Sequence, residues 1–329
     1  MRSKILQLLR AQQGYFSGEE ISRQLAVSRT AIWKHIQALK EDGYEIESHP
    51  RLGYRLLQVP DLLLPAEIKS HLTTRLFGQS RIEYYSELES TNNEAKRLAA
   101  AGCPEGTLVL AEAQGAGRGR LSRGWFSPFA KGIWLSVVLR PPFSPQEAPK
   151  CTMMAAIAVN RAIRRVAKVD SGIKWPNDIL CGGKKLVGIL TEMSAEMDAI
   201  NYVVIGMGMN VNIAETDFPA ELINIATSLS LLAGRPISRL ELLLAVLEEL
   251  EQVYHTVVNE GFKNILQDWR SQSVTLGQTV DVIGINHRFS GVAVDIDEEG
   301  ALLVRTDSGI ERVIAGDISI RAKAAQLGE

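Results

Sequence analysis

A glycine-rich loop with three arginines occupies residues 114 to 128, with the sequence Gln-Gly-Ala-Gly-Arg-Gly-Arg-Leu-Ser-Arg-Gly-Trp-Phe-Ser-Pro. Glycine lets the backbone approach a ligand closely, and the guanidinium groups of Arg118, Arg120 and Arg123 suit phosphate or carboxylate oxygens. The loop does not match the dinucleotide fingerprint G-x-G-x-x-G, because arginine stands where the third glycine would be needed. We therefore predict a site for an anionic nucleotide; the alternative is an exposed, solvated loop.

The middle of the chain contains no histidine. Histidine occurs only at positions 35, 49, 71, 255 and 287, so residues 72 to 254 offer neither a histidine base nor a histidine-rich zinc site. The three cysteines, Cys103, Cys151 and Cys181, form no C-x-x-C pair and have no histidine near them in sequence. This disfavours a cysteine nucleophile, and the odd number of cysteines suits a reducing compartment.

The remaining polar side chains suit catalysis by positioning charge. With the loop arginines, Lys174, Lys184 and Lys185 can hold anions and stabilise charge that develops on phosphate oxygens, while a substrate group acts as nucleophile. Acyl adenylation fits this description, because a carboxylate attacks the α-phosphate of ATP and pyrophosphate leaves. The adjacent lysines have a simpler alternative as a charged turn between strands.

Several further motifs carry a resemblance to a known family. Lys174-Trp175-Pro176-Asn177-Asp178 is followed by Gly183-Lys184-Lys185-Leu186-Val187-Gly188-Ile189-Leu190-Thr191-Glu192. With the Gly-Arg-Gly-Arg loop upstream, the chain resembles the biotin–protein ligases, in particular their bifunctional ligase and repressor form. Ser90-Thr91-Asn92 and the segment 206–212 extend the match, in the expected order, over nearly the whole chain.

The resemblance implies a two-step reaction with biotin, ATP and Mg²⁺. It also implies roles for the matching residues at the biotin end of the site. The expected biotin-binding residues are Ser90, Thr91, Asn92, Gln114, Arg118, Gly119, Arg120 and Lys185. Lys185 matches the lysine that contacts the biotin carboxylate and the α-phosphate, and the expected catalytic residues are Lys185, Arg118, Arg120 and Asp178. Leu190, Val204 and Gly206 are expected to form the apolar floor under biotin.

The nucleotide end is implied in the same way. The expected nucleotide-binding residues are Arg120, Trp125, Lys174, Asn177 and Asn210. Asn212 is a further candidate for the nucleotide and Mg²⁺ region, and no metal ligands are assigned. Asp178 is a candidate for orienting the attacking amine or taking its proton.

Residues 1 to about 60 are predicted to form a winged helix-turn-helix. Ile32, Ile36 and Leu39 recur on one face of the third helix, with Ser28 as its N-cap. The outer face predicts DNA contacts from Ser28, Arg29, Thr30, Lys34 and Gln37. The alternative is a small helical domain for packing or dimerisation.

The predicted fold is α+β with three domains. Residues 1–60 are the winged helix-turn-helix, 61–270 a central α/β ligase domain with a mainly antiparallel sheet, and 271–329 an SH3-like small β-barrel. Helices are expected over 66–71, 91–101 and 151–167, and a last one from Ser238, which begins a capping box.

The charge and the partners complete the prediction. The net charge is −2, but Lys and Arg outnumber Asp and Glu by nine to six over residues 1–60. We expect a cytoplasmic protein, since no apolar run approaches a membrane span. The expected partners are a biotin carboxyl carrier protein of acetyl-CoA carboxylase or a related carboxylase, operator DNA, and a second copy of the chain when biotinyl-AMP is bound. Three alternatives remain: a biotin sensor without catalysis, a lipoate or octanoate ligase, and a ligase whose N-terminal domain only tunes catalysis.

Overall fold

The structure is a computed structural model that describes residues 1–12, 14–41, 43–196, 199–284, 288–315 and 319–322. It divides into two compact units, Met1–Thr73 and the chain from Thr74 onwards. None of the helices in the described ranges is both long enough and apolar enough to cross a membrane.

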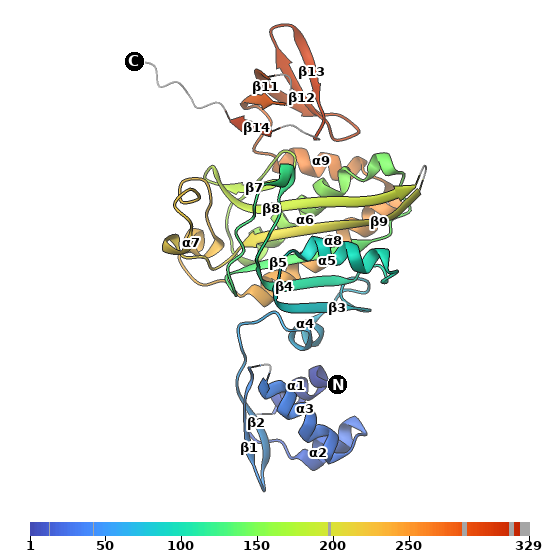
Figure 1. Cartoon of the computed structure of the whole chain (residues 1–329), viewed down its shortest axis with the longest axis vertical. Coiled ribbons are helices and arrows are strands. Elements are labelled where there is room, and N and C mark those ends of the chain that lie inside the picture. Colours follow the sequence, from blue (N-terminus) through green and yellow to red (C-terminus); the bar gives the residue numbers. More distant parts are fainter. Residues whose placement is uncertain (13, 42, 197–198, 285–287, 316–318, 323–329) are drawn as a thin grey trace. The chain divides into compact units, whose positions relative to one another are not determined.

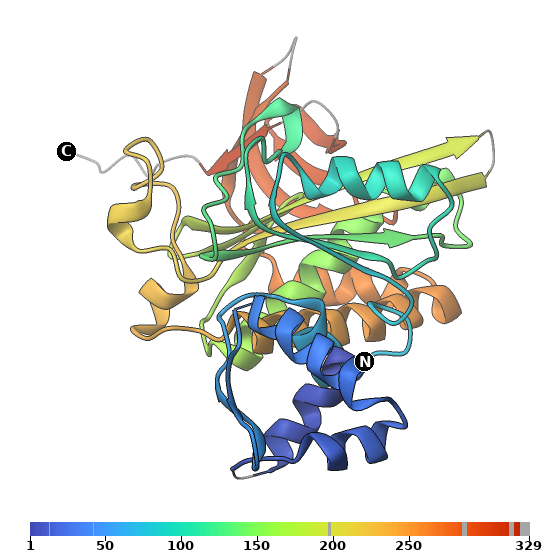
Figure 2. The same cartoon turned by 60° about the horizontal axis from the view of Figure 1, so that its bottom comes forward.

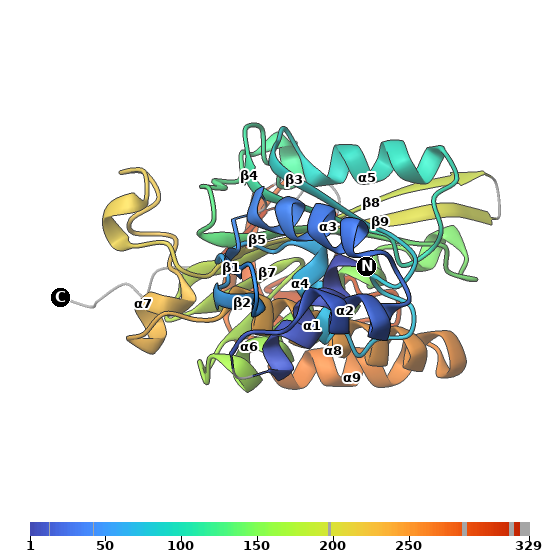
Figure 3. The ribbon, with the colours of Figure 1, turned by 90° about the horizontal axis from the view of Figure 1, so that it is seen from below.

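The N-terminal unit is a helix-turn-helix followed by a hairpin (Figure 3). Its elements are α1 (Arg2–Ala11), α2 (Gly18–Leu25), α3 (Arg29–Glu41), β1 (Glu45–His49), β2 (Gly53–Gln58) and α4 (Pro65–His71). Ala26 turns the chain between α2 and α3 with φ of 53°. Ser28 caps α3, because its Oγ accepts a hydrogen bond from the Ala31 amide at 3.2 Å. The expected stripe of Ile32, Ile36 and Leu39 is fully buried.

Helix α4 packs against the helices of this unit through a buried carboxylate. Glu67 is 1% exposed. It forms an ion pair with Arg10 and accepts a hydrogen bond from the Tyr44 hydroxyl at 2.6 Å. The two partners compensate the cost of burying the charge, so α4 belongs to the first compact unit.

A seven-stranded sheet forms the centre of the second unit (Figure 1). Its strands, in spatial order, are β3 (Ile82–Leu88), β4 (Leu108–Gln114), β5 (Gly132–Leu139), β9 (Ala199–Asn210), β8 (Lys184–Glu196), β7 (Asp178–Cys181) and β6 (Gly172–Lys174). Only β3 and β4 pair in parallel, and the other neighbours are antiparallel. The mainly antiparallel sheet is therefore confirmed.

Helices cover both faces of this sheet. Figure 2 shows α5 (Thr91–Ala100) on one face, and α6 (Lys150–Val166) and α8 (Arg239–Glu260) on the other. The start of α8 is tied to the sheet by Arg239, which donates to Glu112 Oε2 at 2.7 Å and to the Gly132 carbonyl at 3.0 Å. Both side chains of this ion pair are fully buried. Because Glu112 lies in β4, the pair holds in place the end of the strand from which the arginine loop starts.

Strands β8 and β9 present different residues to their two faces, because side chains alternate along a strand. Thr191 Oγ1 lies 2.7 Å from Thr152 Oγ1 of α6, so Thr191 and, by alternation, Ile189 and Val187 face α6. Gly188 pairs with Gly208, and Leu190 pairs with Gly206, on the opposite face. A strip of glycines there leaves room above the sheet for a ligand and for the loop that covers it.

The C-terminal part is a small antiparallel sheet, as predicted. Its spatial order is β13 (Gly309–Val313), β12 (Leu302–Thr306), β11 (Arg288–Ile296), β10 (Thr279–Ile283) and β14 (Ser319–Ala322). Trp175 joins it to the central domain, since its amide donates to Thr275 Oγ1 at 2.9 Å and its Nε1 donates to the Gly300 carbonyl at 3.0 Å.

Apart from short 3-10 turns, two α-helices and two strands in the described part of the chain were not predicted from the sequence. They are β7, α7 (Leu229–Ala233), α9 (Lys263–Gln272) and β14. Strands β7 and β14 are four residues long and α7 only five, which is too short to show a period. Helix α9 buries only Ile265, Leu266 and Trp269, so its apolar stripe is narrow.

Candidate functional site

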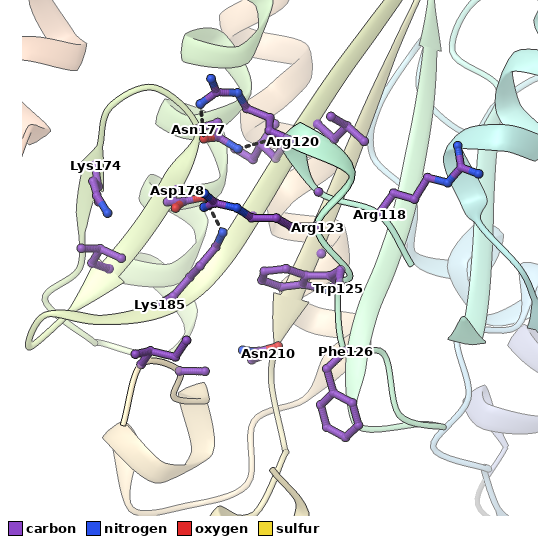
Figure 4. A pocket seen from close by; sticks show the side chains of 18 of the residues that line it. Arg118, Arg120, Arg123, Trp125, Phe126, Lys174, Asn177, Asp178, Lys185 and Asn210 are labelled. Atoms are coloured by element: carbon purple, nitrogen blue, oxygen red, sulfur yellow. Dashed lines mark hydrogen bonds and ion pairs between the residues drawn. The ribbon is translucent and has the colours of Figure 1, made fainter. Parts of the chain in front are cut away.

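A cavity of about 920 Å³ opens above the glycine strip of β8 and β9 (Figure 4). Its walls come from the start of α5, the arginine loop, the segment 174–190, the segment 218–226 and the first residues of the C-terminal sheet. Such a volume suits a small-molecule site. Asp178 is the one carboxylate among the described residues that line it.

One end of the cavity is a network of uncharged polar groups. Gln114 Oε1 accepts hydrogen bonds from the Thr91 amide at 2.9 Å and from Thr91 Oγ1 at 3.2 Å. Gln114 Nε2 donates to Ser127 Oγ at 2.9 Å. Ser136 Oγ lies 2.8 Å from Thr91 Oγ1 and 2.6 Å from Asn92 Oδ1. The network holds these groups in fixed directions, which suits recognition of a polar ring such as a ureido group.

The amide of Asn92 is held in a single orientation over β9. Its Nδ2 donates to Glu192 Oε2 at 2.9 Å and to the Leu190 carbonyl at 3.2 Å. Glu192 is itself paired with Lys96 Nζ at 2.5 Å. A Cβ added at Gly206 would lie 2.0 Å from Asn92 Oδ1, so only glycine accommodates the Asn92 side chain there.

The indole of Trp125 lies on the same glycine strip. A Cβ at Gly208 would be 2.3 Å from Trp125 Nε1, and one at Gly188 would be 2.8 Å from Cζ3. The indole N–H is buried without a hydrogen-bond partner in the described part of the chain. Lys185 Nζ lies 5.1 Å from the centre of the indole ring system, which is within cation–π range. Trp125 thus forms an aromatic wall of the cavity.

Lys185 and Asp178 form the charged centre of the cavity. Lys185 Nζ lies 2.7 Å from Asp178 Oδ1, and the two side chains are 34% and 17% exposed. The backbone of Lys185 also pairs with the segment that follows Phe218, because its amide donates to the Ile225 carbonyl at 2.7 Å. A strand and a distant loop therefore hold the ammonium group in place.

The arginine loop folds into a tight hairpin. Arg118 and Gly124 form a β-bridge, and the Gly119 amide donates to the Arg123 carbonyl at 2.7 Å. Leu121 and Ser122 at its tip both have φ of 56°, a left-handed conformation that costs non-glycine residues about 1 kcal/mol each.

The arginines of this loop point in different directions. Arg120 donates to Asn177 Oδ1 at 3.3 Å and to the carbonyl of Ala315 in the C-terminal part. The guanidinium of Arg118 points away from the Lys185–Asp178 pair (Figure 4). Arg120 is therefore anchored to groups across the cavity, whereas Arg118 is directed away from the charged pair.

The structure gathers in one cavity all the residues that the sequence analysis named as biotin-binding, nucleotide-binding or catalytic. The set that lines the cavity comprises Ser90, Thr91, Asn92, Gln114, Arg118, Gly119, Arg120, Trp125, Lys174, Asn177, Asp178, Lys185 and Asn210. Leu190 and Gly206, expected in the floor, also line it.

Two expectations at the edge of the site are wrong. Val204 packs in the core beneath α5, with Ala95 and Val109, and not in the cavity floor. The Asn212 amide is used structurally, since its Nδ2 donates to the Ile237 carbonyl at 2.9 Å and its Oδ1 accepts from the Ile237 amide at 3.0 Å. Val204 lies on the same face of β9 as Gly206, but α5 covers that part of the strand.

Other lining residues carried no sequence signal. Phe218, Leu222, Asn224, Ile225 and Ala226 come from an irregular segment, and Val274, Thr275, Gln278 and Val280 from the start of the C-terminal part. Neither stretch contains a motif. The first stretch reaches the site because the Lys185 amide donates to the Ile225 carbonyl. The second reaches it because the Trp175 amide donates to Thr275 Oγ1.

The cysteines agree with the expected absence of a thiol nucleophile. Cys151 is fully buried, and burial raises its pKa to about 12, so it remains a thiol near neutral pH. None of the three cysteines lines the cavity.

Fold and cavity together define a ligase domain built for an anionic nucleotide, in one chain with a helix-turn-helix. Residues 2–55 match the HTH domain family, 85–210 the biotin/lipoate A/B protein ligase family, and 275–321 the biotin protein ligase C terminal domain. The bifunctional ligase/repressor BirA of Bacillus subtilis is 44% identical over 97% of this chain and 98% of that protein. BirA of Escherichia coli is 30% identical over 97% of each chain.

A solved structure agrees. Biotin protein ligase from Aquifex aeolicus in complex with biotin and ATP is 28% identical, with a TM-score of 0.65, and covers 74% of this chain and 99% of that one. The chain belongs to the family of bifunctional biotin–protein ligases and repressors.

Proposed function

We propose that the cavity binds biotin at its polar end and ATP at its cationic end. The carboxylate of biotin attacks the α-phosphate, pyrophosphate leaves, and biotinyl-5′-AMP forms. The observation that carries this proposal is the position of Lys185, which lines the same cavity as the polar network around Thr91 and lies 5.1 Å from the ring of Trp125 in the arginine loop. A fixed ammonium group there stabilises the charge that develops on the phosphate oxygens.

In the second step the neutral amine of a carrier lysine attacks the mixed anhydride, forms an amide and releases AMP. The carrier is a biotin carboxyl carrier domain of acetyl-CoA carboxylase or a related carboxylase. Asp178 is the acid of the cavity that can orient this amine or accept its proton. We assign Ser90, Asn92 and Gln114 to biotin, and Arg120 and Asn177 to the nucleotide, as the family resemblance implies. All five residues line the cavity, which supports this assignment.

Mg²⁺ accompanies the ATP phosphates in this proposal. Asp178 with the amide oxygens of Asn177 and Asn210 offers the oxygen donors that Mg²⁺ accepts, alongside phosphate and water. When bound, the ion would neutralise phosphate charge.

The helix-turn-helix places this ligase on operator DNA. We propose that the retained adenylate orders the arginine loop and promotes dimerisation, which presents two α3 helices to two half-sites. The free thiols of Cys103, Cys151 and Cys181 suit the cytoplasm, where ATP and the carrier are present.

ATP–pyrophosphate exchange tests the substrate. Purified protein is supplied separately with biotin, lipoate or octanoate, since the matched family includes lipoate ligases. Exchange with biotin only is expected, and exchange with another acid alone would overturn the substrate. Gel-shift titrations with and without biotin plus ATP test the repressor coupling, and equal affinity in both would contradict it.

A further inference from the structure

Trp33 is a large apolar side chain on the outer face of α3. It is 53% exposed. It follows Arg29 by four residues and Thr30 by three, and Lys34 follows Thr30 by four, so the four side chains lie together on one side of the helix. The three partners are all exposed, while Ile32 and Ile36 face inward. The indole was not among the expected DNA contacts, yet it lies in their midst.

The surroundings of Trp33 do not resemble an apolar surface for another protein. The other exposed large hydrophobic residues in the described part of this unit are Met1, Leu52, Leu57 and Val59. They lie at the N-terminus, in the hairpin and after it, and none belongs to α3. The neighbours of the indole are instead a guanidinium, a hydroxyl and an ammonium group. The cationic side chains suit a polyanion, and the indole between them suits an apolar group on that same polyanion.

DNA presents such a group in the major groove. The 5-methyl of thymine is the apolar feature on the base edges there, and apolar side chains contact it. In a helix-turn-helix, residues in the N-terminal half of the second helix reach the base edges. Trp33 is the fifth residue of α3, which begins at Arg29.

We propose that Trp33 is a sequence-reading residue whose indole packs on a thymine methyl group in each half-site. Arg29 and Lys34 beside it contact the phosphates and set the depth of the helix in the groove. The inference rests on the DNA-binding role of the N-terminal unit and adds a base preference to it.

The first test measures binding to selected DNA. Duplexes are selected by the full chain, with biotin and ATP, from a random pool, and affinities are compared for Trp33→Ala, Trp33→Phe and Lys34→Ala. Trp33→Ala is expected to lose about tenfold on the selected duplex and nothing on unselected DNA, with an unchanged salt slope. Lys34→Ala is expected to weaken both and to reduce the slope by about one. Equal losses on both DNAs for Trp33→Ala, or no loss, would overturn the proposal.

The second test removes only the methyl group. Each thymine of the selected duplex is replaced in turn by deoxyuridine. The original chain is expected to lose several-fold affinity at one position per half-site, and Trp33→Ala to show no further loss there. A loss of the same size in both proteins would refute the contact.

Three controls distinguish base reading from misfolding, from self-association and from a lack of DNA binding. Unchanged binding of Trp33→Ala to unselected DNA shows that the N-terminal unit is folded, while biotin transfer to a carrier domain shows that the ligase unit is intact. Trp33→Phe with the deoxyuridine series decides the question if Trp33→Ala does not fold. A Trp33→Ala defect that disappears at high protein concentration would assign the indole to self-association and overturn the proposal. Failure to enrich any duplex would overturn DNA binding itself, whereas enrichment with a neutral Trp33→Ala would refute only this inference.

Discussion

The ammonium group of Lys185 lies 2.7 Å from the carboxylate of Asp178. Both line the cavity, so in the chain without ligand each balances the charge of the other. An anion that binds Lys185 must share the lysine with Asp178 or displace it. We expect phosphate binding to loosen this pair, and Asp178 is then available to an incoming amine.

Lys185→Ala is expected to lower adenylation by about 10²–10³-fold, because a fixed cation facing the developing phosphate charge is removed. Biotin-dependent ATP–pyrophosphate exchange measures this. Lys184→Ala is the matched control, since Lys184 Nζ donates to the Ile223 carbonyl at 3.0 Å and does not line the cavity. Near-normal exchange in Lys185→Ala would refute the role.

Asp178→Asn is expected to slow transfer from preformed adenylate to the carrier by about 10²-fold or more, since the amide cannot accept a proton. Pyrophosphate exchange should fall less. Single-turnover transfer to a purified carrier domain, compared with exchange in the same preparation, separates the two steps. Equal losses in both would show that Asp178 serves only to position Lys185.

Arg120→Gly is expected to release biotinyl-AMP sooner. The substitution removes the bonds from the loop to Asn177 and to the Ala315 carbonyl, so the loop no longer closes the cavity. Free adenylate would then label bystander proteins, which a biotin blot of added albumin detects. Arg120→Lys is the control, because it keeps the charge but not the planar fork. Labelling confined to the carrier in both variants would contradict the expectation.

Glu192→Leu is expected to raise the KM for biotin by about tenfold, the effect of one hydrogen bond to a charged group. Asn92 would lose the acceptor that orients its amide, whereas the nucleotide end is untouched. The KM for ATP and kcat should therefore change little, and Glu192→Gln should restore part of the affinity. Lys96→Met, which leaves the Asn92–Glu192 bond in place, should be milder. A parallel rise in the KM for ATP would indicate a general structural defect.

The main elements were predictable because they follow local rules, and most of the site residues were predicted from the motifs that carry the family resemblance. The buried stripe of α3 follows the helical period, and Gly206 and Gly208 alternate on one face of β9 as a strand requires. Val204 shows the limit of such rules. It lies on the same face of β9 as Gly206, but whether α5 or the cavity covers that face at Val204 depends on where α5 ends, and no pattern within β9 specifies that.

The sequence by itself determined the chemistry: cations but no histidine between residues 72 and 254, glycines where a ligand approaches the sheet, and a basic face on α3. Only the tertiary structure decided which distant groups complete the site. Asn92 and Glu192 are 100 residues apart in the chain, and Arg120 and Ala315 are 195 apart. Such pairs form when strands and domains pack together, because a hydrogen bond needs its atoms within about 3 Å, and no local pattern in the chain specifies that distance.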